Sequence, residues 1–326
     1  MNLIRLKRFV RSNRYTRKMV DGIYAILTGQ YREKKHIVSR NGEIYYVIRP
    51  PYAANGLGGL YLFVLGHMEY AYSKGYIPVV DFGHGKTVYS GDEVSGSQNV
   101  WEWYFLQPGG VSLKKAFSGN YILARTAPRQ AGDLFIQLMR GNKDIVGQYF
   151  KIGGGGGITL ADSVEKHIEK TKEELFPVGE KVLGVFYRGT DYVQLKPCGH
   201  PVQPEIGSLV AKVKERLSEW GNDKIFLLTE EKNTMLLFEK EFPGMVISTH
   251  QNLVENYSVD SGLLIEDYKT KQFGNRYVSG LEYLTGIVLL ASCDSFIGAI
   301  AGGSATALMM NGGKYTHCQV IDLGVY

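Results

Sequence analysis

The chain has 326 residues, of which 44% are hydrophobic and 21% charged, an ordinary globular composition. Its length suits two α/β domains, and its net charge of +5 falls short of a dedicated nucleic-acid-binding protein. Three cysteines without a CxxC pair argue against a disulfide framework and a zinc site, and they indicate a reducing, cytoplasmic setting. No apolar run is long enough to span a membrane, and the start lacks the apolar region of a signal peptide.

The first 18 residues are strongly basic, with seven Lys or Arg side chains and no acid. Leu3, Leu6 and Val10 recur at helical spacing among these charges. The pattern predicts a basic helix, which either lies peripherally on an anionic membrane or packs, solvated, on the first domain.

The N-terminal half begins with a strand, a glycine turn, a helix and a second strand. The strands are predicted at residues 45–48 and 77–81, and the helix runs from the turn that holds Gly58 and Gly59 to about residue 74. An aromatic segment at 101–105 fits either a platform for an acceptor sugar or buried core, and core is favoured. Five consecutive glycines at 153–157 predict a loop or hinge near a domain boundary.

The C-terminal half alternates strands and helices. Strands are predicted at 182–187, 225–228, 245–247, 295–300 and 320–321, with helices at 161–176, 206–220, 233–242, 281–291 and 304–310. Unbroken apolar strands between helices are typical of a parallel sheet covered on both faces. We therefore expect a basic segment at 1–20 and two α/β domains at 21–160 and 161–326.

Polar groups follow the strands of this half, where ligands of parallel sheets bind. Arg188, Thr190 and Asp191 come directly after the strand at 182–187. A guanidinium is always charged and offers a planar fork of donors, which suits a diphosphate and the negative charge that develops on it when a glycosidic bond breaks. The alternative is a capped turn in which Asp191 bonds the backbone.

Further candidates lie later in the chain. They are His200, Thr229, Glu230, Glu231, Asp294, Ser304, Ala305 and Thr306. The last three open a helix after two glycines, and a helix start attracts anions. We expect all of these groups to converge on one edge of one sheet.

These residues, in this order, resemble the fucosyltransferase superfamily of α1,6-, α1,2- and protein O-fucosyltransferases. Its signature is a strand ending His-x-Arg-Arg-x-Asp, followed by a His-Pro, which Arg188, Asp191 and His200 match in part. Gly58 and Gly59 are similar to its Gly-x-Gly-Asn turn, and the likeness spans about residues 50 to 312. It implies two Rossmann-like domains facing a cleft, the GT-B type. The second domain would hold GDP-fucose and the first the acceptor.

The resemblance also implies roles. Arg188 would hold the β-phosphate, Asp294 would lie near the guanine and Ser304 would touch phosphate. The chain departs from the family at Phe186, which replaces the histidine, and at Gly189, which replaces the second arginine. Lys196 stands where the α1,6 enzymes have a glutamate that is a candidate for the base. The base is therefore left open between Asp191, Glu205 and a dissociative reaction with little need of one.

The expected function is an inverting, metal-independent sugar transfer, with fucose from GDP-fucose, to a glycan or lipid-linked glycan. Two alternatives remain, which are another nucleotide sugar as donor and a non-catalytic homologue that binds a sugar nucleotide. No cofactor and no nucleic-acid partner are expected, and the location is cytoplasmic or peripheral at the membrane surface.

Overall fold

The computed structural model describes residues 34–39, 41–50, 56–84, 87–89, 98–124, 158–249, 253–255, 257, 265, 268–269 and 274–326. The predicted basic helix and the five-glycine loop lie outside these residues. The described residues up to Glu165 form a compact N-terminal unit, and Lys166–Tyr326 form a C-terminal unit. No helix within the described ranges is both long enough and apolar enough to cross a membrane.

The N-terminal unit is built on a four-stranded sheet with the order β1-β4-β2-β3. Its strands are β1 (Lys34–His36), β2 (Ile44–Ile48), β3 (Ile77–Val80) and β4 (Asn120–Ala124). β2 runs parallel to β3 and β4, whereas β1 pairs antiparallel with β4. Helix α3 (Leu57–Ser73) joins β2 to β3 as predicted, while β1 and β4 were not predicted.

The aromatic segment of this unit belongs to the core. It forms a short 3₁₀ helix, η1 (Val100–Trp103), and the side chains of Trp101, Tyr104 and Phe105 are almost fully buried. The Trp101 ring lies 4.4 Å from the Phe105 ring and 5.5 Å from the Phe82 ring, between centroids. The core interpretation is therefore confirmed over the sugar platform. Helix α4 (Leu113–Ser118) follows and leads into β4.

The C-terminal unit is a five-stranded parallel sheet with the order β7-β6-β5-β8-β9. Its strands are β5 (Val182–Tyr187), β6 (Lys224–Thr229), β7 (Val246–Ile247), β8 (Ser295–Ala299) and β9 (His317–Ile321). Its helices are α7 (Asp162–Leu175), which belongs to this unit from Lys166 onward, and α8 (Thr190–Leu195), α9 (Ile206–Trp220), α10 (Lys232–Glu241), α12 (Arg276–Ala291) and α13 (Gly302–Asn311). The strand order reverses between β5 and β8, and in doubly wound sheets ligands bind at the carboxyl ends beside such a reversal.

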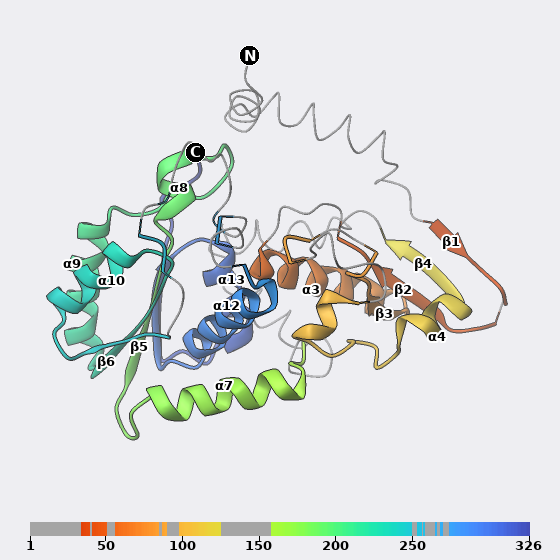
Figure 1. Cartoon of the computed structure of the whole chain (residues 1–326), viewed down its shortest axis with the longest axis horizontal. Helices are drawn as coiled ribbons and strands as arrows, with labels where there is room; N and C mark the ends of the chain where they lie inside the picture. Colours follow the sequence, from red (N-terminus) through yellow and green to blue (C-terminus); the bar gives the residue numbers. More distant parts are fainter. Residues whose placement is uncertain are drawn as a thin grey trace, which may run out of the picture. The chain divides into compact units, whose positions relative to one another are not determined.

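Helices cover both faces of this sheet, as the unbroken apolar strands predicted (Figure 1). Leu183 and Val185 of β5 pack in one cluster with residues of α9 and α10. Gly184, between them, faces the other way, where an added methyl group would come within 2.8 Å of Leu290 in α12. The alternation of side chains along β5 thus separates a layer of α9 and α10 from a layer that contains α12.

In the C-terminal unit, the start of one helix and the presence of another differ most from the sequence prediction. Helix α12 begins at Arg276 rather than residue 281, because the Asn275 side chain caps it by accepting the Val278 amide at 3.1 Å. Helix α8 occupies a stretch for which no helix was predicted. It starts immediately after β5, so it sets the geometry of the polar residues at the end of that strand.

Candidate functional site

Arg188 directly follows β5, at the carboxyl edge of the C-terminal sheet and beside the reversal of strand order. It is buried and forms a two-pronged pair with Asp191, in which Nε donates to Oδ1 at 3.1 Å and Nη2 to Oδ2 at 3.0 Å. The guanidinium carbon also lies 4.5 Å from the ring centroid of Tyr192. Because bidentate pairs fix direction as well as distance, Arg188 is held in one orientation at the sheet edge.

Asp191, in the first turn of α8, is completely buried. Besides Arg188, its carboxylate accepts hydrogen bonds from the Thr190 hydroxyl and the Ile265 amide, each at 3.4 Å. Burial raises the pKa of Asp191, but Arg188, the Ile265 amide and nearby His200 together lower it further, to below its ordinary value. Asp191 therefore stays ionised and holds Arg188. A carboxylate with a lowered pKa is a poor proton acceptor, which argues against Asp191 as the base.

Glu231 lies two residues after the end of β6, and its side chain lies against Gly189. A methyl group on Gly189 would come within 2.3 Å of the Glu231 Oε2 atom and 2.6 Å of the Tyr187 ring. The carboxylate therefore fills the space beside residue 189. This gives a physical reason for the glycine at the position where the resembled family has its second arginine.

The two carboxyl groups near Arg188 differ in their electrostatics. Burial raises the pKa of Glu231, and the hydrogen bond that it accepts from the Thr234 hydroxyl at 2.8 Å opposes this only in part. Burial, assisted by the charge of Glu231, also raises the pKa of Tyr187 to about 12, so that side chain remains a neutral phenol. Carboxyl groups with opposite pKa shifts are suited to different tasks, and here Asp191 positions a cation while Glu231 can bind hydroxyl groups.

A cavity of about 230 Å³ lies beside Glu231. Its other lining residues are Thr190, Gln194, Asn233, Val254, Glu255 and Tyr257. Thr229, the last residue of β6, and Glu230, which follows it, were also predicted for the site and are buried; the Thr229 hydroxyl accepts the Glu231 amide at 3.3 Å. This hydrogen bond fixes the backbone of Glu231, and the cavity could take a small polar group.

His200 joins Arg188 through Tyr192, a residue that the sequence analysis did not single out. The His200 and Tyr192 rings meet edge to face at 5.0 Å between centroids, so Tyr192 contacts the arginine and the histidine. The His200 segment is anchored by two backbone hydrogen bonds with Tyr326, at 2.9 and 3.0 Å. The only hint of these contacts in the sequence was that an aromatic residue, Tyr192, directly follows Asp191.

The start of α13 lies at the same edge, after β8. Ser304 is buried, and its hydroxyl lies 2.6 Å from the Ala299 carbonyl and 2.8 Å from the Ala301 amide. The Thr306 hydroxyl donates to the Gly302 carbonyl at 2.7 Å, and Ala305 is buried beside them. An anion at this helix start would therefore meet backbone N–H groups and the helix dipole rather than these hydroxyls.

The expectation that Asp294 joins this group is wrong. Asp294 precedes β8, which runs parallel to β5, so it stands at the amino edge of the sheet, opposite Arg188. Its carboxylate accepts the Val182 amide at 2.8 Å and thereby caps the beginning of β5. The sequence analysis placed Asp294 at the carboxyl end of the neighbouring strand, whereas it lies at the amino end.

Gly58 and Gly59 stand in the first turn of α3, in the N-terminal unit. The preceding Leu57 amide donates to the Tyr89 hydroxyl at 3.0 Å, so a side chain already serves this helix start. A ligand role for the two glycines stays a prediction. Across the described ranges, no group of three or more His, Cys, Asp or Glu side chains is arranged to hold a metal ion.

No protein-family model matches the chain, and no curated protein matches it in sequence. Among solved structures, it is similar to fucosyltransferase NodZ from Bradyrhizobium, with 14% identity, 82% of this chain and 92% of that chain covered, and a TM-score of 0.47. NodZ α1,6-fucosyltransferase co-crystallised with GDP gives 14% identity, coverage of 83% and 92%, and a TM-score of 0.48. POFUT1 in complex with GDP is 9% identical, with 86% of this chain and 99% of that chain covered and a TM-score of 0.46. Likenesses this remote assign neither activity nor substrate to the chain.

Proposed function

We propose that this chain is an inverting glycosyltransferase that takes fucose from GDP-fucose and transfers it to a hydroxyl group of a glycan or lipid-linked glycan. The observation that carries the proposal is the buried, oriented Arg188 at the carboxyl edge of a doubly wound sheet. Ligands of such sheets bind beside the reversal of strand order, and here Arg188 and the start of α13 stand on its two sides. GDP-fucose is the donor implied by the motif resemblance.

The geometry suits the charge that develops during sugar transfer. As the bond between the sugar C1 and the β-phosphate oxygen breaks, its electron pair stays on the phosphate, while the acceptor oxygen bonds C1 from the opposite face. A cation already fixed in place stabilises this charge without reorganisation, and more in the transition state than in the ground state. Arg188 would supply that cation, because Asp191 holds its guanidinium in one orientation at the end of β5.

The remaining groups divide the work between the units. Glu231 and the adjoining cavity would accept hydrogen bonds from hydroxyl groups of the donor, and the α13 start would face the diphosphate. The N-terminal unit would bind the acceptor. We place the reaction in the cytoplasm, with the basic first 20 residues at an anionic membrane surface.

The test is a thermal-shift screen against GDP-, UDP-, CMP- and dTDP-sugars, followed by turnover measurements. We expect GDP and GDP-fucose at about 100 times Kd to add about 2.7 kcal/mol to the free energy of unfolding. Asp294→Asn is the matched control, because it lies at the far edge of the sheet and should keep the shift. A shift with UDP-sugars alone would overturn the donor, and donor binding without turnover would overturn the activity.

A further inference from the structure

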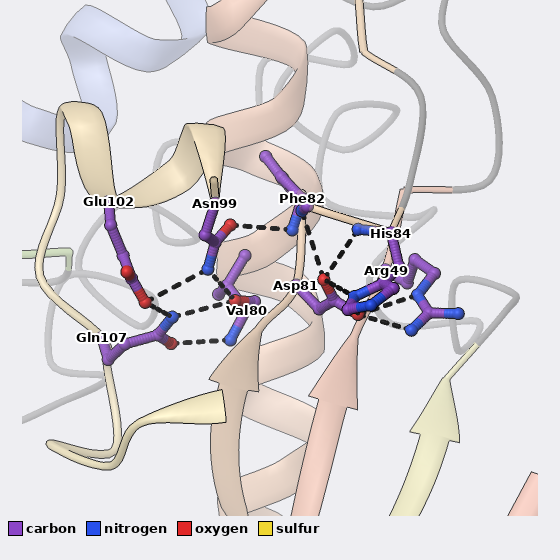
Figure 2. A network of polar contacts seen from close by, with 9 residues as sticks. Arg49, Val80, Asp81, Phe82, His84, Asn99, Glu102 and Gln107 are labelled. Atoms are coloured by element: carbon purple, nitrogen blue, oxygen red, sulfur yellow. Dashed lines mark hydrogen bonds and ion pairs between the residues drawn. The ribbon is translucent and has the colours of Figure 1, made fainter. Parts of the chain in front are cut away.

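The N-terminal unit has its own polar cluster at the carboxyl edge of its sheet (Figure 2). Arg49 directly follows β2, and Asp81 directly follows β3. From β2 the chain first adds β3 on one side and later β4 on the other, so the order of the strands reverses at β2. Parallel sheets bind ligands at the carboxyl ends beside such a reversal, and Arg49 stands at that position.

Asp81 engages one edge of the Arg49 guanidinium and leaves the other edge open. The Arg49 Nε and Nη2 atoms both donate to Asp81 Oδ2, at 3.0 and 2.5 Å, whereas Nη1 points away from the carboxylate in Figure 2. Within the described ranges, no hydrogen bond or ion pair reaches Nη1, and the Arg49 side chain is 21% exposed. Because a guanidinium carries five N–H donors in a planar fork, the edge formed by Nη1 and Nη2 can make a second two-pronged contact.

The negative charge of Asp81 is shared among several donors. Its carboxylate is completely buried, and Oδ1 accepts the backbone amides of Gly83 and His84 at 3.2 and 3.0 Å. The His84 Nδ1 atom lies 3.1 Å from Oδ1 and 3.2 Å from Oδ2. Backbone N–H groups offset part of the field of a carboxylate, so Asp81 cancels less of the positive charge of Arg49. His84, whose side chain is 51% exposed, is a second group here that can carry positive charge.

The strand end that carries this carboxylate is clamped by three side chains. Asn99 accepts the Phe82 amide at 2.9 Å and donates to the Val80 carbonyl at 2.7 Å. Gln107 accepts the Val80 amide at 2.8 Å and donates to the Val80 carbonyl at 2.9 Å. Glu102 accepts hydrogen bonds from both amide side chains, at 3.2 and 2.7 Å, and Figure 2 shows it on the far side of the strand end from the guanidinium. The clamp therefore fixes the position of the cluster without bringing a second carboxylate to the arginine.

The pair of Arg49 and Asp81 is not needed to join its two strands. β2 and β3 are already paired at four positions, the last of them Ile48 with Val80, and the Asp81 amide donates to the Ile48 carbonyl at 2.8 Å. A buried ion pair often adds little to stability, because the cost of desolvation offsets the attraction. The position and the open edge of Arg49 therefore favour a binding role over a purely structural one.

We propose that Arg49 binds one anionic group, a carboxylate or a phosphate, and that Asp81 is the residue that positions it. Two oxygens on one carbon or phosphorus atom match the two N–H groups of the open guanidinium edge. Both residues belong to the N-terminal unit, so the site is complete within that unit.

The proposed function gives this site a use. The N-terminal unit would bind the acceptor, and the anionic group would then be part of the acceptor. It would be either the carboxylate of an acidic sugar or the phosphate that joins a glycan to a lipid. This use rests on the proposed function, whereas the binding site does not.

The experiment measures anion binding to the full chain in the absence of any nucleotide sugar. Glucuronate and methyl phosphate are the probes, and glucose is the neutral control. In NMR of ¹⁵N-labelled arginine side chains, the Arg49 Nε resonance of the wild-type protein should shift saturably with at least one anionic probe and not with glucose. By calorimetry, Arg49→Lys should weaken that binding about tenfold or more, because lysine keeps the charge but lacks the planar fork.

Arg216→Lys is the matched control. The Arg216 side chain is also 21% exposed, but Glu215, Glu219 and Gln319 already engage its guanidinium. This variant should therefore bind the probes as the wild-type protein does.

The outcomes separate the ligand, the site and its use. A shift with glucuronate alone supports an acidic sugar as the ligand, and a shift with methyl phosphate alone supports a phosphate. An Arg49 resonance that moves with neither probe, or wild-type affinity in a folded Arg49→Lys variant, would overturn the site and leave the proposed function standing. If Arg49 binds an anion but the protein binds no nucleotide sugar, the site stands and only its use in acceptor binding fails.

Discussion

Replacing Arg188 with lysine keeps a positive charge at the end of β5 but removes the planar fork that pairs with Asp191. From the sequence alone, the fold would be expected to tolerate this change, because the residue stands at the mouth of a strand. The structure predicts a different result. Asp191 is completely buried, so water cannot replace a hydrogen bond that its carboxylate loses.

The size of both effects follows from the geometry. A hydrogen bond to a charged group contributes about 1.5–3 kcal/mol, and an ammonium group at this distance from the backbone can keep at most one of the two bonds. We therefore expect the free energy of unfolding to fall by about 1.5–3 kcal/mol in Arg188→Lys. Loss of an oriented donor to the transition state typically lowers kcat by about 10²–10³-fold, and we expect a loss of that size.

The assay combines denaturant unfolding with steady-state kinetics. Donor affinity should fall less than kcat, because Arg188 acts mainly on charge that develops during the reaction. Arg216→Lys is the matched control, since Arg216 on α9 also combines a hydrogen bond, to Gln319 at 2.8 Å, with an aromatic contact, to Trp220. It should leave kcat near the wild-type value. Wild-type turnover together with wild-type stability in Arg188→Lys would refute the role of this pair in both folding and chemistry.

Two further changes test the structure directly. His67 is completely buried, and burial lowers its pKa from 6.5 to about 3. Below pH 6.5 this histidine takes up a proton in the unfolded chain but not in the folded one. The free energy of unfolding should therefore fall by about 1.4 kcal/mol for each unit by which the pH is lowered from 6.5 to about 3. Urea titrations from pH 4 to 7 would show this, and an equally steep slope in His67→Gln would contradict the assignment. Gly189→Ala should destabilise the protein, and Glu231→Ala should relieve part of that loss; additive effects in a double-mutant cycle would argue against the contact.

The sequence predicted the C-terminal unit more fully than the N-terminal one, for a physical reason. β5 is buried along its whole length, so its apolar run is continuous and its polar neighbours stand out. β4 was missed because it follows the helix that ends at Ser118 with only Gly119 between them, so no turn signal separates the two elements. Its place in the sheet depends on pairing with β2, which is distant along the chain, and no local pattern reports such a contact.

The candidate sites show the same limit. Arg188 and Asp191 are three residues apart, so their pairing was within reach of local reasoning. The contact of Arg49 with Asp81 joins the ends of two strands, and sequence spacing does not reveal it. Asp294 shows a different error, because a residue that precedes a parallel strand lies at the amino edge, whatever its order among the motifs.

The arrangement around Arg188 explains how one arginine could serve where the resembled family has two. Asp191 cancels much of the charge of Arg188, so the pair provides orientation more than net attraction. Glu231 fills the space beside Gly189. Its raised pKa means that the carboxyl group takes up a proton more easily, which reduces its electrostatic repulsion of a nearby anion. Attraction for a diphosphate would then come mainly from the start of α13, while Arg188 would act on the charge that develops as the bond to the sugar breaks. Since neither group has a duplicate among the described residues at this edge, sugar transfer should depend strongly on each of them.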